Sequence, residues 1–67
     1  MSAPEFPELL TAKDVSRITG VPVSTLHLWA VQRESGQPVG PVCYKLGRNR
    51  RWSRTDVLDW LAQNRVA

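Results

Sequence analysis

The first run of apolar residues at helical spacing follows a strong helix-start signal. Val15 and Ile18 lie three positions apart, so they share one face of a helix. Thr11 and Asp14 stand at the spacing of a capping box, in which each side chain bonds the other's backbone N–H. The pattern therefore predicts a helix over residues 12–19.

A second helix is predicted over residues 23–33. Leu26, Trp29 and Ala30 recur at offsets of three and four, which places them on one face. The preceding "GVP", residues 20–22, forces a short turn because proline excludes its predecessor from the helical region. Two short helices joined by such a turn are typical of a helix-turn-helix, in which the outer face of the second helix is free.

The middle of the chain changes from helical to strand patterning. "ESGQPVGP", residues 34–41, reads as a loop because of its glycines and prolines. "VCYKL" (residues 42–46) and "RRWS" (residues 50–53) flank "GRN" (residues 47–49), which predicts two short strands around a tight turn. A β-hairpin is therefore expected after the second helix.

A third helix is predicted after Ser53, which is suited to cap it, with Asp56 in the capping-box place. It should end near Arg65. The order helix, turn, helix, hairpin, helix predicts a mainly α winged helix-turn-helix over residues 9–65, preceded by a flexible arm over residues 1–8. The expected core consists of Leu10, Val15, Ile18, Val21, Leu26, Trp29, Leu46, Trp52, Val57, Trp60 and Leu61.

Composition limits the classes of function. At 67 residues the chain makes one small domain, with little room for a substrate cleft and its supporting shell. Cys43 is the only cysteine and cannot form an internal disulfide, and with one histidine it supplies too few ligands for a structural zinc site. No apolar run reaches the length of a membrane span, and the start lacks a signal-peptide pattern. We expect a cytoplasmic protein without cofactor or metal.

Positive charge is concentrated in the predicted hairpin. The ten residues "KLGRNRRWSR" (residues 45–54) hold five cations and no acid, whereas the rest of the chain has four basic and six acidic side chains. A solvated surface segment is the plain alternative. Beside a helix-turn-helix, however, double-stranded DNA is the expected partner, because a helix fits the major groove and a basic loop can follow the backbone or enter the minor groove.

The predicted DNA-binding residues fall into two sets. Arg48 is the best candidate for minor-groove insertion, Arg50 can share that role, and Arg51 should point to the opposite face. If three to five cations neutralise phosphates, log affinity should fall with log salt at a slope of about −3 to −5. The wing and phosphate set comprises Lys45, Arg48, Asn49, Arg50, Arg51 and Arg54; the recognition-helix set comprises Ser24, Thr25, His27, Leu28, Gln32 and Arg33.

The recognition helix offers few specific base contacts. Its hydroxyls can bind a phosphate or a base edge, and neither contact is strongly specific. His27 can donate to either group or remain a solvated surface histidine. Leu28 can meet a thymine methyl group or pack against the hairpin. Modest base discrimination is expected, with DNA shape and repeated binding supplying part of the specificity.

From "LLTAKDVSRITGVPVSTLHLW" to "RRWSRTDVLDWL", about residues 9–62, the chain resembles the excisionase-like branch of the MerR-type winged-helix superfamily. The resemblance implies a phage or mobile-element protein that binds and bends attachment-site DNA beside an integrase and directs recombination toward excision. It also implies that the second helix enters the major groove and the wing the minor groove. Family members often carry a charged residue where this chain has Leu28.

Full MerR regulators continue into a long dimerisation helix, whereas this sequence ends at Ala67. We therefore expect a monomer in solution, and the resemblance to excisionases implies that its copies associate head to tail on DNA. A small transcriptional regulator using the same surface on an operator is the second hypothesis, and a pure protein-interaction module is the third. An enzyme is not expected, because Cys43 falls in a predicted strand and His27 on an outer helix face.

Overall fold

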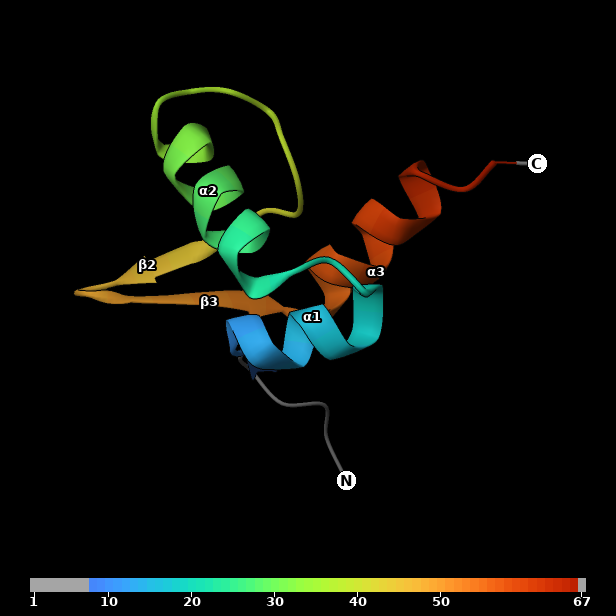
Figure 1. Ribbon diagram of the computed structural model, residues 1–67, viewed down its shortest axis with the longest axis horizontal. Coiled ribbons are helices and arrows are strands. Elements are labelled where there is room, and N and C mark those ends of the chain that lie inside the picture. The colour runs from blue at the N-terminus through green and yellow to red at the C-terminus, as the bar shows by residue number, and fades with distance from the viewer. Residues whose placement is uncertain (1–7, 67) are drawn as a thin grey trace, which may run out of the picture.

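The computed structural model describes residues 8–66, so the expected N-terminal arm lies outside the described residues except for Glu8. None of the helices over this range is both long and apolar enough to cross a membrane. The elements, shown in Figure 1, are β1 (Leu9–Leu10), α1 (Ala12–Thr19), α2 (Val23–Glu34), β2 (Tyr44–Leu46), β3 (Asn49–Ser53) and α3 (Arg54–Gln63).

The hairpin belongs to a three-stranded antiparallel sheet of order β1-β3-β2. Leu10 pairs with Trp52, so the chain ahead of α1 adds a strand that the sequence pattern did not predict. Two residues are too few to show strand alternation. The turn of the wing, formed by β2 and β3, is also shorter than predicted: Asn49 pairs with Leu46, which leaves Gly47 and Arg48 as the turn.

The predicted helix starts are largely confirmed. Thr11 and Asp14 form both bonds of the capping box, each at 3.2 Å. Ser53 accepts a hydrogen bond from the backbone N–H of Asp56 at 3.0 Å, which caps α3. α2 begins after Pro22 without a side-chain cap, as expected from a residue that has no polar side chain.

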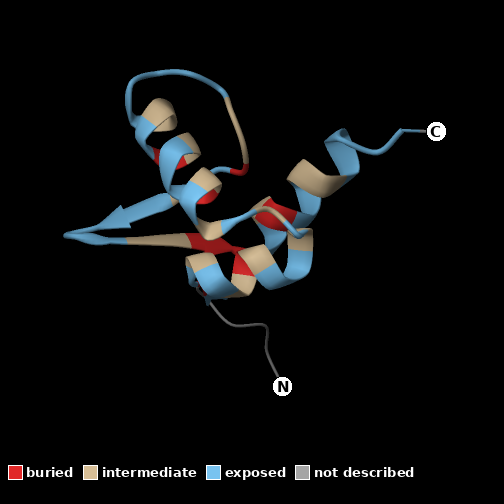
Figure 2. Cartoon of the chain, viewed as in Figure 1, coloured by how far each residue is buried: buried red, intermediate tan, exposed pale blue. Residues whose placement is uncertain are grey.

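The core lies where the two helices of the helix-turn-helix and the start of α3 meet β3 (Figure 2). Five predicted core residues are buried, namely Leu10, Val15, Leu26, Trp52 and Val57. Three more, Val21, Trp29 and Leu61, are half-buried and pack against this cluster, and Trp60 is half-buried beside Trp29.

Two core predictions are wrong, and the predicted core omits Ala30, Pro41 and Ser53, which are buried. Ile18 is 41% exposed and Leu46 is 48% exposed. Ile18 lies in the last turn of α1, about 60° around the helix from the buried Val15, so it faces the rim of the small sheet. Leu46 precedes the wing turn, where no helix covers the sheet. Ala30 is 2% exposed, because a small side chain lets α2 approach the core closely.

Candidate nucleic-acid interface

The outer face of α2 is free of packing and carries part of the predicted recognition set. Leu26 and Ala30 turn one side of the helix into the core. On the opposite side, Ser24 is exposed, Leu28 is 55% exposed and Val31 is 48% exposed. Leu28 is therefore available to an apolar group such as a thymine methyl.

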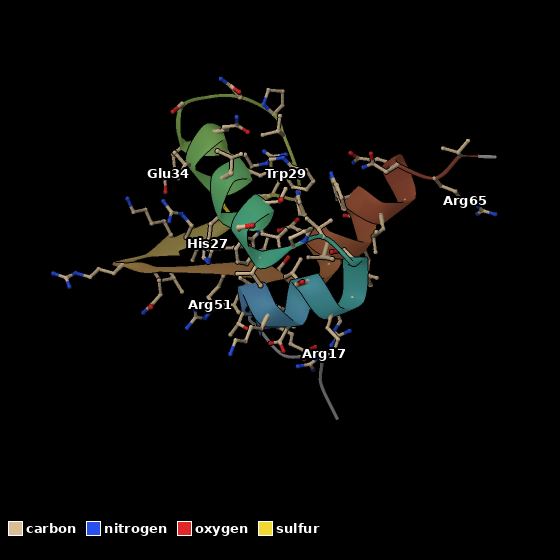
Figure 3. All side chains as sticks on the ribbon, viewed as in Figure 1. Arg17, His27, Trp29, Glu34, Arg51 and Arg65 are labelled. Carbon is tan, nitrogen blue, oxygen red and sulfur yellow. The ribbon has the colours of Figure 1, made fainter. Side chains whose placement is uncertain are left out.

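The two flanks of α2 differ. His27 is exposed on the side of the wing (Figure 3). Its ring lies 6.4 Å from the ring of the buried Trp52, edge to face at 62°. That contact orients the imidazole, so His27 is more constrained than a freely solvated histidine. On the other flank, Thr25 and Gln32 are half-buried.

Arg33 lines a depression with Lys45, but its guanidinium is bound to the loop that follows α2. Its Nε and a terminal nitrogen donate to the carbonyl oxygen of Gly40 at 3.2 and 2.9 Å. This two-pronged contact holds the loop that follows α2. A contact between Arg33 and DNA stays a prediction, and the hydrogen bonds favour a structural role.

The wing presents two different faces because strand side chains alternate. The register pairs Lys45 with Arg50 and Tyr44 with Arg51. Lys45 and Arg50 thus share the face toward α2, together with the buried Trp52 two residues on. Arg51 points to the opposite face, as predicted, and donates to the carbonyl oxygen of Arg50 at 2.8 Å.

Glu34, the last residue of α2, bridges the recognition helix and the wing. Its carboxylate lies 3.0 Å from a terminal nitrogen of Arg50 and 3.7 Å from the Lys45 ammonium. Two cations of the predicted wing and phosphate set therefore share one acid. The sequence analysis did not single out Glu34, because the pairing with Arg50 spans 16 positions of the chain. Its place at the end of α2, next to a hairpin rich in cations, is the only sequence signal for it.

The position of Arg50 lowers the stability of the fold, because it buries a polar nitrogen atom. Its side chain is 20% exposed, and its Nε is buried without a hydrogen-bond partner among the described residues. A buried donor left unpaired costs about 1–3 kcal/mol. Arg48, by contrast, is exposed at the wing turn, where its charge can meet a phosphate or enter a groove.

Arg54 at the start of α3 is held by Glu8. Its Nε donates to the Glu8 carboxylate at 2.8 Å, and its backbone N–H donates to the Glu8 carbonyl oxygen at 2.9 Å. The side-chain hydrogen bond lowers the pKa of Glu8 and raises that of Arg54. A phosphate would have to compete with this exposed ion pair for Arg54.

A groove of about 370 Å³ joins the recognition helix to the wing. It is lined by Thr11 and Lys13 at the start of α1, by His27 on α2, and by Arg48 and Arg51 on the wing. Lys13 is exposed and was absent from the predicted set, because its position on the first helix carried no basic cluster. The groove gathers cations from α1 and the wing, which are separate in the sequence, and such side chains are the usual partners of a nucleic-acid backbone.

Cys43 lies just before β2 and is half-buried. Burial raises the pKa of its thiol, so the thiol stays protonated at neutral pH and is a poor nucleophile. His27 lines the groove described above, whereas Cys43 lines a separate depression with Val42 and Lys45.

Three helices, of which the second has a free outer face, and a basic two-stranded wing define a winged helix-turn-helix protein. This confirms the predicted fold class. The chain belongs to the helix-turn-helix domain family, whose model matches residues 9–65. No curated protein and no solved structure matches the chain. Helix-turn-helix domains place their second helix in the major groove, so the class of function is DNA binding.

Proposed function

We propose that this protein is an excisionase, a recombination directionality factor that binds and bends attachment-site DNA so that an integrase of a phage or mobile element excises it. The protein does no chemistry in this role. The observation that carries its DNA-binding part is the free outer face of α2 beside a wing whose Arg48 is exposed. The part specific to excision rests on the resemblance of residues 9–62 to excisionase-like proteins.

The proposed complex places Ser24 and Leu28 of α2 in the major groove and Arg48 in the adjacent minor groove. Lys13 and Arg51 line the groove between these elements and are placed to meet the intervening phosphates. Bending a short site costs on the order of 1–6 kcal/mol, a cost that several bound copies can share.

The first experiment is a footprint across DNA flanking the protein's own gene, at two salt concentrations. Evenly spaced sites in one orientation beside a crossover region are expected for an excisionase. An inverted repeat over a promoter would favour the second hypothesis, a transcriptional regulator that uses the same surface. No protection at low salt would contradict DNA binding itself.

The wing is tested by Arg48→Ala combined with Arg50→Ala. This variant should bind every sequence more weakly, and its salt slope should flatten by about one to two, since each lost phosphate contact removes about 0.9. The matched control, Arg17→Ala with Arg65→Ala, removes the same charge from residues that lie away from the wing (Figure 3). Equal losses for the two variants would show that net charge, not the wing, governs affinity.

A further inference from the structure

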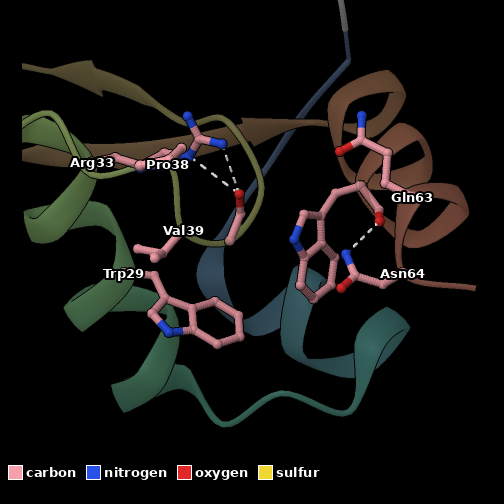
Figure 4. A pocket seen from close by; sticks show the side chains of 8 residues that line it. Trp29, Arg33, Pro38, Val39, Gln63 and Asn64 are labelled. Atoms are coloured by element: carbon pink, nitrogen blue, oxygen red, sulfur yellow. Dashed lines mark hydrogen bonds between the residues drawn. The ribbon is translucent and has the colours of Figure 1, made fainter.

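A second groove, of about 500 Å³, lies between α2, the loop that follows it and the last turns of α3 (Figure 4). Two of its lining residues are tryptophans: Trp29 comes from α2 and Trp60 from α3, with ring centres 5.7 Å apart and planes inclined at 57°. Both indoles are only half-buried. The DNA-binding role uses neither of them.

The groove is held in shape by contacts within this copy of the chain. The Arg33 guanidinium fixes the loop through its two bonds to the Gly40 carbonyl oxygen. Gly40 has φ +69°, and a Cβ there would lie 2.6 Å from Cε3 of Trp29. Glycine is therefore needed for the loop backbone to approach the indole. A site with fixed walls binds a segment without first ordering itself.

The groove stays open when α2 and the wing engage a duplex. Trp29 lies two positions after His27, which places the two side chains about 160° apart around α2. Figure 3 shows His27 toward the wing and Trp29 on the side toward α3. The wing and α3 extend in opposite directions from the core (Figure 1). A ligand in this groove can therefore coexist with DNA.

The chain itself contains a segment with the chemistry that such a groove binds. Residues 4–7 read Pro-Glu-Phe-Pro, with two prolines three positions apart. This spacing suits a polyproline II helix, whose proline rings lie against aromatic side chains and whose rigidity reduces the entropy lost on binding. Its carbonyl oxygens have no internal partners, and the Gln63 amide on the groove wall can donate to one.

The segment cannot lie along the groove of its own copy. Glu8 is hydrogen-bonded to Arg54, the first residue of α3, and Pro7 adjoins Glu8, which keeps it within about 4 Å of that residue. Trp60 lies about 9 Å along α3 from Arg54, and Gln63 about 14 Å, so both prolines cannot enter the groove together. We propose that the Trp29–Trp60 groove binds the Pro4–Pro7 segment of a second copy of this chain.

This proposal deepens the proposed function, and it rests on that function for the idea that copies stand side by side on DNA. The N-terminal segment of one copy would then occupy the groove of the next. Repetition of this contact joins the copies head to tail, and each contact raises the effective concentration of the next copy.

The first test uses the full-length protein and a synthetic peptide of residues 1–8. The indole N–H resonances of Trp29 and Trp60 should shift saturably, while that of the buried Trp52 should not. The same peptide with Pro4→Ala and Pro7→Ala should bind at least about tenfold more weakly, a loss of about 1.4 kcal/mol. Absence of a shift at millimolar peptide would overturn the proposal, and so would equal binding of the two peptides.

A matched pair of glycine variants tests the groove itself. Gly36 and Gly40 both have positive φ, but a Cβ at Gly36 meets nothing within 4 Å. Gly40→Ala should abolish peptide binding, whereas Gly36→Ala should retain it. Retained binding in Gly40→Ala would place the peptide elsewhere and overturn the proposal. The peptide substitutions leave the protein untouched, so they decide the question even if Gly40→Ala does not fold.

The second test compares the parent chain and its Pro4→Ala/Pro7→Ala variant on DNA with one or two adjacent sites. Affinity for one site should be the same, and the variant should lose the cooperativity between two sites. Equal cooperativity would overturn the proposal. If the protein bound no DNA, the proposed function would fail, while the peptide titration would still decide the role of the groove.

Discussion

Ser53 ends β3 and caps α3, so one side chain fixes the angle between the wing and the last helix. It is 2% exposed, and its hydroxyl accepts from the Asp56 backbone N–H. We expect Ser53→Ala to lower the free energy of unfolding by about 1–2 kcal/mol, because it leaves that N–H without its partner. Urea unfolding measures the change.

Ser35→Ala is the matched control for this prediction. The Ser35 hydroxyl also bonds the backbone, donating to the Val31 carbonyl oxygen at 3.3 Å, but it is exposed and water can replace it. Its loss should cost a few tenths of a kcal/mol. A Ser53→Ala variant as stable as Ser35→Ala would show that the cap does not couple wing and helix.

Residues with local partners were the ones that the sequence predicted well. Thr11 and Asp14 lie three apart, and their reciprocal bonds follow from spacing alone. Glu8 and Arg54 lie 46 positions apart, and no periodicity links them. The same holds for Glu34, whose partner cations were assigned to DNA without the acid that the fold places beside them.

At the scale of elements, α2 and the wing are connected by the ion pairs of Glu34 with Lys45 and Arg50, called here the ionic strut. Glu34 holds Lys45 and Arg50 and also places a negative charge beside the surface that would meet phosphate. We expect Glu34→Gln to raise the affinity for any DNA several-fold at low salt and to steepen the salt slope by about one. It should also reduce the difference in affinity between cognate and random DNA, because the wing is no longer held in position by Glu34.

Binding isotherms for cognate and random DNA at several salt concentrations measure this effect. Asp59→Asn removes the same charge from an exposed position on α3, away from the wing, and serves as the control. If Glu34→Gln changed affinity and slope no more than Asp59→Asn does, the strut would have no part in binding.

The helices and the wing could be predicted because each carries its own start, stop or alternation signal. β1 could not, since a two-residue strand has no period and exists only through pairing with β3. The exposed face of α2 could be predicted from helical geometry, but the hydrogen bonds of Arg33 could not. Arg33 bonds Gly40 because the loop after α2, which is rich in proline and glycine, folds back over α2, and the path of such a loop cannot be read from the sequence.

At the scale of the whole molecule, acid should weaken the fold through Glu8 and Asp14. Hydrogen bonds from Arg54 and from the Thr11 backbone hold the pKa values of Glu8 and Asp14 below their ordinary 4.5 and 3.8. A depressed pKa means that the carboxylate contributes stability above its unfolded pKa and loses it as the pH falls through the folded pKa. The loss should therefore begin near pH 4.5 and grow below it.

Thermal unfolding between pH 7 and pH 2.5 measures this dependence. The Glu8→Gln/Asp14→Asn variant should be less stable than the parent at neutral pH and should lose less on acidification, so that the two curves converge. Parallel curves would contradict the assignment. Both carboxylates are exposed, so the effect should also shrink as salt is added.

Arg50 and Arg51 point to opposite faces of β3, so the wing can be lengthened without exchanging these faces only by two residues at a time. Adding one residue to a strand would exchange the inward and outward arginines rather than extend the tip. Adding two residues to each strand keeps both faces and advances Arg48 by about 7 Å, close to the roughly 7.5 Å depth of a minor groove. The depth to which Arg48 inserts can thus change only in steps of about one groove depth, which makes paired insertions and deletions the variants that preserve this surface.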